Sequence, residues 1–104
     1  MDFPQYLELK FLEWQHEKGG RKTVGEFAEY LGIAQSTASS YMNGKRIPEG
    51  ETLRYIAIKL GIEVYDVLGL PRPDPDLLYL QSHWHEYSAE KRRKLREQAE
   101  KYKP

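Results

Sequence analysis

Between residues 35 and 43 the sequence concentrates short hydrogen-bonding side chains: Gln35, Ser36, Thr37, Ser39, Ser40 and Asn43. A solvated helix more often carries Lys and Glu, because Ser and Thr are poor helix formers. A glutamine amide can form two hydrogen bonds with adenine, and serine and threonine hydroxyls can contact several bases. These side chains could therefore form hydrogen bonds with the edges of DNA bases. The alternative is a helix that is merely polar and solvated.

Two short helices joined by a tight turn are predicted to position this polar face. Thr23 and Glu26 have the spacing of a capping box, which opens the first helix. Its apolar side is expected to bury Val24, Phe27, Ala28 and Leu31. Gly32 suits the left-handed conformation that ends a helix, and Ile33 then turns inward. Backbone N–H groups at the start of each helix can bind phosphates.

The apolar residues recur with helical spacing along almost the whole chain, so the fold class is predicted to be all-α. Further helices are predicted at about 4–17, 50–60, 64–68, 75–86 and 89–102. Asp74-Pro75 and Ser88 provide start signals for the last two.

Three prolines between residues 69 and 76 cannot continue a helix. We therefore predict a domain over 1–70, a Pro-rich linker over 71–76 and a C-terminal helical hairpin over 77–104. The hairpin has an apolar stripe that needs a partner surface: Leu77, Leu80, Trp84 and Tyr87. We hypothesise that this hairpin is a dimerisation element. Its basic run, Lys91 to Arg96, lies beside Glu90, Glu97 and Glu100, which favours a solvated face over a DNA-backbone arm.

Composition narrows the class of protein. The 16 Lys and Arg side chains balance 16 Asp and Glu, which argues against strong non-specific binding of nucleic acid. The chain has no cysteine, so disulfides and Cys-based zinc sites are excluded. No apolar run is long enough for a membrane span, and the N-terminus lacks the basic stretch and apolar run of a signal peptide. A cytoplasmic protein is therefore expected. His83 and His85, two residues apart, point to different sides of a helix and predict no metal site. No catalytic signature or cofactor motif is found, so an enzyme is not expected.

Over about residues 6–70 the sequence resembles the Cro/repressor-type helix-turn-helix family, also called the xenobiotic-response-element family. The resemblance rests on fragments in a fixed order: Phe27-Ala28, Leu31-Gly32-Ile33, Gln35-Ser36-Thr37, Asn43-Gly44-Lys45, Pro48, Leu53-x-x-Ile56-Ala57-x-x-Leu60-Gly61-Ile62 and Val67-Leu68. It implies a five-helix phage-repressor-like bundle that binds double-stranded DNA, usually as a dimer on palindromic sites.

The resemblance also implies roles for individual residues. Gln35, Ser36 and Ser40 occupy base-reading positions. Thr37, Asn43 and Lys45 match positions near phosphates, and Thr23, Lys22 and Arg46 are further candidates for backbone contact. Three residues depart from the family pattern. Val24 stands where the family often has Gln, Ala34 stands where it often has a capping Ser or Thr, and Met42 stands where it favours Glu.

Together these observations predict a small transcriptional regulator, a repressor, that binds double-stranded DNA sequence-specifically as a homodimer. A recognition helix at about 35–43 is expected to enter the major groove. The alternative is a protein-interaction module, an antitoxin or adaptor, that uses the same fold and binds a protein through the C-terminal hairpin. The neutral net charge and Val24 favour that alternative mildly.

Overall fold

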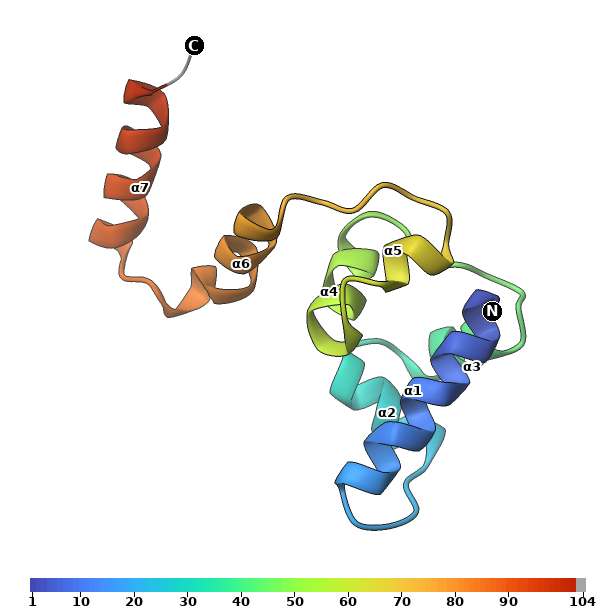
Figure 1. Cartoon of the computed structure of the whole chain (residues 1–104). Coiled ribbons are helices and arrows are strands. Elements are labelled where there is room, and N and C mark those ends of the chain that lie inside the picture. The colour runs from blue at the N-terminus through green and yellow to red at the C-terminus, as the bar shows by residue number, and fades with distance from the viewer. Residues whose placement is uncertain (103–104) are drawn as a thin grey trace. The chain divides into compact units, whose positions relative to one another are not determined.

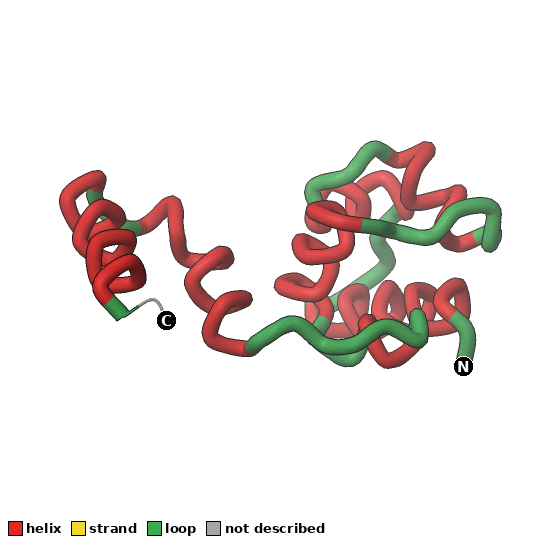
Figure 2. Tube along the Cα trace, turned by 90° about the horizontal axis from the view of Figure 1, so that it is seen from above, coloured by secondary structure: helices red, strands yellow, loops and turns green. Residues whose placement is uncertain are grey.

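The computed structural model describes residues 1–102 and divides the chain into two compact units, Met1–Arg72 and Pro73–Pro104. Each unit is described by itself. The prediction of an all-α fold is confirmed, since every regular element of the described residues is a helix (Figure 2). None of these helices is long and apolar enough to span a bilayer.

The first unit contains five helices: α1 (Phe3–Glu17), α2 (Val24–Leu31), α3 (Gln35–Met42), α4 (Gly50–Leu60) and α5 (Val64–Val67) (Figure 1). α3 packs against both α1 and α2. α1 also contacts α5, while α4 contacts α2 and α5. The predicted helical segments of this region are all present, with ends within a few residues of those expected from the sequence.

Local capping explains where α1 and α2 begin. Asp2 accepts a hydrogen bond from Gln5 N at 2.9 Å, and the Gln5 side chain accepts one from Asp2 N at 3.0 Å. Thr23 and Glu26 form the predicted capping box, with Glu26 N donating to Thr23 Oγ1 at 3.1 Å. Gly32 has φ 74°, the left-handed conformation that lets the chain leave α2 and enter α3.

The core of the first unit is built around Phe27, whose side chain is fully buried. Its ring centroid lies 5.1 Å from that of Phe11 and 5.3 Å from that of Trp14, so α2 is held against α1 by aromatic contacts. Val24 was predicted to be buried and is only half-buried, because it lies in the first turn of α2. Val64 is completely buried, although the sequence analysis did not single it out.

A polar network at α1 ties that helix to the segment before α5. Tyr6 Oη donates to Glu63 Oε1 at 3.0 Å, and Lys10 Nζ lies 3.2 Å from the same oxygen. Partial burial would raise the pKa of Glu63, but hydrogen bonds from its own backbone N–H, Lys10 and Tyr6 lower it overall. Burial and the same carboxylate raise the pKa of Tyr6. Glu63 therefore favours folding most when it is ionised.

Glu63→Gln is expected to lower the free energy of unfolding at neutral pH by about 0.2–1 kcal/mol, the range for a partly exposed ion pair. Because the pKa of Glu63 is lowered in the folded state, its contribution is present above its ordinary pKa of 4.5 and is lost as pH falls below that value. Urea unfolding on both sides of pH 4.5 checks this. A difference between the two proteins that did not shrink in acid would contradict a role for the charge.

The second unit contains α6 (Pro75–His83), a 3-10 turn (Trp84–Glu86) and α7 (Ala89–Lys101). Asp74 accepts from the backbone N–H groups of Asp76 and Leu77, and Ser88 accepts from that of Lys91, so both predicted caps are confirmed.

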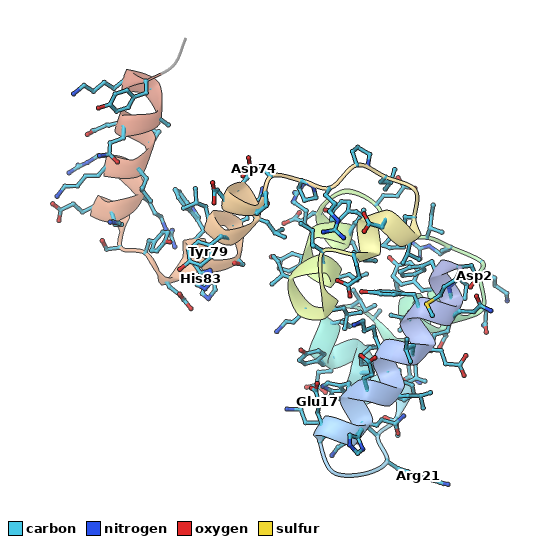
Figure 3. The ribbon with its side chains drawn as sticks, viewed as in Figure 1. Asp2, Glu17, Arg21, Asp74, Tyr79 and His83 are labelled. Carbon is cyan, nitrogen blue, oxygen red and sulfur yellow. The ribbon has the colours of Figure 1, made fainter. Side chains whose placement is uncertain are left out.

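The predicted helix over 75–86 ends early, at His83, before the 3-10 turn. There the chain tightens into the 3-10 turn, which Tyr87 N closes by donating to Trp84 O at 3.2 Å. In the last turn of α6, Ser82 Oγ donates to Tyr79 O at 2.9 Å, and His83 Nδ1 lies 3.0 Å from the same oxygen. Figure 3 shows the rings of Tyr79 and His83 beside each other, with centroids 4.2 Å apart.

The described residues of the second unit include no buried side chain. Within the predicted apolar stripe, Leu77 is 51% exposed and Trp84 is 39% exposed, while Leu80 and Tyr87 are half-buried. α7 contacts the preceding turn through Arg92, whose Nε donates to Trp84 O at 2.9 Å and whose guanidinium lies 5.8 Å from the Trp84 ring centroid. The stripe therefore stays largely uncovered.

Candidate nucleic-acid interface

The polar residues of α3 gather on one side of the helix. At about 100° per residue, Gln35, Ser36, Ser40 and Asn43 fall within an arc of about 140°. Ala38 and Tyr41 lie on the other side, where they are 0% and 3% exposed. The burial of Tyr41, expected from the sequence, is confirmed. The core-facing residues thus fix which side of α3 meets solvent.

The predicted base-reading residues differ in exposure. Gln35 and Ser36 form the first turn of α3 and are exposed, whereas Ser40, one turn further along, is half-buried. Ser39 lies between them on the same arc, is half-buried and belongs to the same surface. Ser39 is not among the base-reading positions predicted from the sequence.

The predicted backbone-contacting residues lie on both sides of this surface. Lys22 and Thr23 stand just before α2 and are exposed. The backbone N–H of Lys22 donates to Gln15 Oε1 at 2.9 Å, which fixes the loop where it joins α2. Figure 3 shows Arg21, one residue earlier, pointing away from the helices.

The other backbone candidates lie in α3 and directly after it. Thr37 is half-buried and lies about 60° beyond the polar arc, and Asn43, Lys45 and Arg46 are exposed. The turn is held by Lys45 N, which donates to Ser40 O at 2.9 Å, and by Gly44 at φ 74°. Lys45 and Arg46 therefore lie in a defined turn directly after the polar arc of α3.

The start of α3 has no side-chain cap. Ala34 occupies the N-cap position and its methyl group cannot accept a hydrogen bond, as the sequence predicted. The N–H groups of the first turn are consequently open to an outside acceptor, and helix N-termini favour anions. A DNA phosphate is such an acceptor.

α3 also carries no charged side chain. Tyr41 is its sole titratable residue, and burial raises the pKa of that phenol, with nearby Glu49 adding to the effect and Arg46 opposing it. Any electrostatic attraction for a polyanion must therefore come from flanking cations and backbone dipoles.

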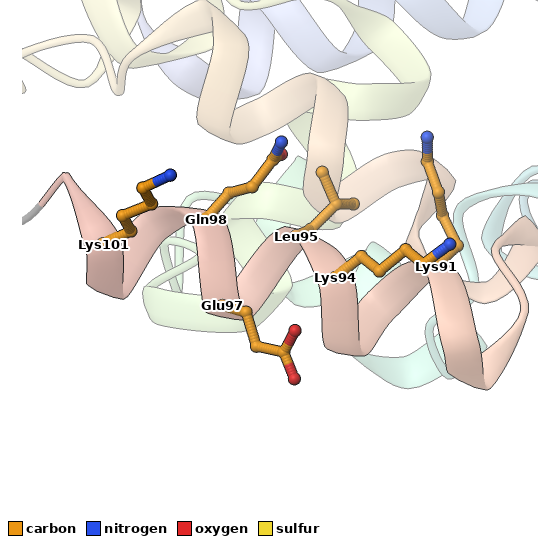
Figure 4. Close-up of a pocket in the computed structure, with 6 residues that line it drawn as sticks. All are labelled: Lys91, Lys94, Leu95, Glu97, Gln98 and Lys101. Atoms are coloured by element: carbon orange, nitrogen blue, oxygen red, sulfur yellow. The ribbon is translucent and has the colours of Figure 1, made fainter.

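Other surfaces of the described residues offer less chemistry. No group of three His, Asp or Glu side chains among residues 1–102 comes close enough together to hold a metal ion. A hollow on α7 is lined by Lys91, Lys94, Leu95, Glu97, Gln98 and Lys101 (Figure 4). Because all six come from one helix, the hollow is a groove between neighbouring side chains and not an enclosed site.

One residue of this region was missed by the sequence analysis. Gly25, the second residue of α2, lies directly beneath the amide of Gln35: a Cβ at Gly25 would come 2.9 Å from Gln35 Oε1. The only sequence signal was the presence of a glycine inside a helix, which is uncommon without a packing reason.

This arrangement of two short helices around a tight turn, with a polar and uncharged second helix, defines a helix-turn-helix DNA-binding domain. Residues 21–67 match the model of a helix-turn-helix family. This match supports a helix-turn-helix regulator of the Cro/repressor type, as the sequence resemblance predicted. No match was found among curated proteins or among solved structures.

Proposed function

We propose that the protein is a cytoplasmic, non-enzymatic repressor that binds double-stranded DNA sequence-specifically and as a homodimer. α3 enters the major groove, where Gln35, Ser36 and Ser40 contact base edges. Backbone contacts come from Thr23, Thr37, Asn43, Lys45, Lys22 and Arg46. The observation that carries this proposal is the exposed, uncharged polar arc of α3, whose opposite side is anchored in the core.

The neutral charge of α3 suits base recognition better than general attraction to DNA. Phosphate contacts supply affinity that is independent of sequence, whereas base contacts supply specificity. Here the cations lie outside the polar arc, at Lys22 before α2 and at Lys45 and Arg46 after α3. Such a division lets backbone contacts set the register while the arc reads the bases.

The second unit supports the homodimer. Its stripe of Leu77, Leu80, Trp84 and Tyr87 is largely uncovered within this unit, and a second copy of the same stripe can cover it. We propose that the C-terminal helical hairpin over 77–104 is a dimerisation element, joined through the Pro-rich linker over 71–76 to the DNA-binding domain over 1–70.

Selection from a random duplex DNA pool tests the function. We expect an inverted repeat with half-sites about one helical turn apart, bound roughly 10³-fold or more tightly than scrambled DNA. Titration at about 50 and 200 mM salt separates specific from electrostatic binding, since the latter falls steeply with salt.

A paired Leu77→Ala and Trp84→Ala variant is the control for assembly. It should still select the half-site but no longer the repeat. Recovery of a single half-site by the unmodified protein would contradict the dimer. No enrichment at all would contradict DNA recognition and would leave a protein partner for the second unit as the better explanation.

A further inference from the structure

Gly25 occupies a place in α2 where its own backbone gives no reason for glycine. Gly25 lies inside a helix, and its φ angle is not positive. A glycine in such a place destabilises a helix relative to alanine, because it loses more backbone entropy on folding. The reason for glycine at this position must therefore lie in the space around it.

That space is taken by the side chain of Gln35. A Cβ on Gly25 would lie 2.9 Å from Gln35 Oε1 and 3.3 Å from Gln35 Cδ, with Thr23 Oγ1 at 3.7 Å. The first of these distances is too short for a real contact, so a methyl group would displace the amide. Gln35 is exposed and the displaced group is the far end of a flexible chain, so the helices themselves need not move.

We propose that Gly25 is a specificity-determining residue: it leaves room for the Gln35 amide to rest against the first turn of α2, and so sets where that amide meets the DNA. The inference rests on the proposed function, because it assigns Gly25 a role in base recognition by Gln35. Gly25 is a positioning residue, since it acts through the side chain of another.

Gly25→Ala is the direct test. We expect the variant to be at least as resistant to urea as the unmodified protein, because alanine favours the helix. Its affinity for the selected site should nonetheless fall about three- to tenfold, with relaxed preference at the base pair that Gln35 contacts and unchanged binding to scrambled DNA. A simple structural defect would move stability and affinity in the same direction.

Gly20→Ala is the matched control. A Cβ at Gly20 meets nothing within 4 Å, and this glycine has no positive φ. The control should leave both base preference and affinity unchanged.

A double-mutant cycle shows whether Gly25 acts through Gln35. In a Gln35→Ala background there is no amide to displace, so Gly25→Ala should cause no further loss. An equal loss in both backgrounds, or an unchanged base preference in the single variant, would overturn the inference. Failure of the proposed function gives a different result, since the unmodified protein would then select no site at all.

Discussion

Phe27→Ala is expected to lower the free energy of unfolding of the first unit by about 3–5 kcal/mol. Phe27 is 0% exposed and its ring contacts those of Phe11 and Trp14 on α1. Truncation removes apolar contact and leaves a cavity that the surrounding rings cannot fully close. Because small domains are stable by only about 5–15 kcal/mol, this single change removes a large part of the total. Urea unfolding followed by circular dichroism measures it.

Leu12→Ala provides the comparison for that experiment. Leu12 is also an apolar residue and lies on α1, but it is 54% exposed, so its truncation should change stability by no more than about 0.5 kcal/mol. Equal effects of the two substitutions would mean that Phe27 does not organise the core as described.

Gln35→Ala is expected to weaken binding to the selected DNA site by about 1–3 kcal/mol, while binding to random DNA stays the same. The amide offers both a donor and an acceptor, and its loss leaves one base edge without a partner. Because Gln35 is exposed, the stability of the fold should hardly change. Competition titrations against sites altered at each base pair locate the position that loses its preference.

Gln98→Ala is the matched substitution for that measurement. Gln98 is an exposed glutamine on α7, outside the proposed reading surface, and its replacement should leave the DNA preferences intact. If Gln35→Ala weakened the selected and random DNA equally, Gln35 would be a general contact and not a base reader.

Features that depend on neighbours in sequence were predictable. The Thr23 and Glu26 capping box, the left-handed Gly32 and the Ser88 cap each depend on a few adjacent residues, and each is present in the structure. The helical spacing of apolar residues likewise predicted α4 with both of its ends. The fixed order of such fragments predicted the family.

Features that depend on tertiary packing were not predictable. The burial of Val64 follows from the contact of α5 with α1 and α4, and a helix of four residues shows no periodicity. The early end of α6 follows from the change to a 3-10 turn at Trp84–Glu86, which the helical spacing of apolar residues does not reveal. The closeness of Gly25 to Gln35 arises only when α2 and α3 cross, so the candidate site was predicted as a set of residues but not as a geometry.

The absence of charge on α3 has a consequence for the conditions under which the protein works. Gln, Ser, Thr and Asn do not titrate, and the pKa of Tyr41 is raised above its ordinary value of 10.0. Acidification or mild alkalinity therefore leaves the hydrogen-bonding pattern of the proposed reading surface unaltered. If this surface reads DNA as proposed, a change of cellular pH is not expected to alter the base sequence that it selects.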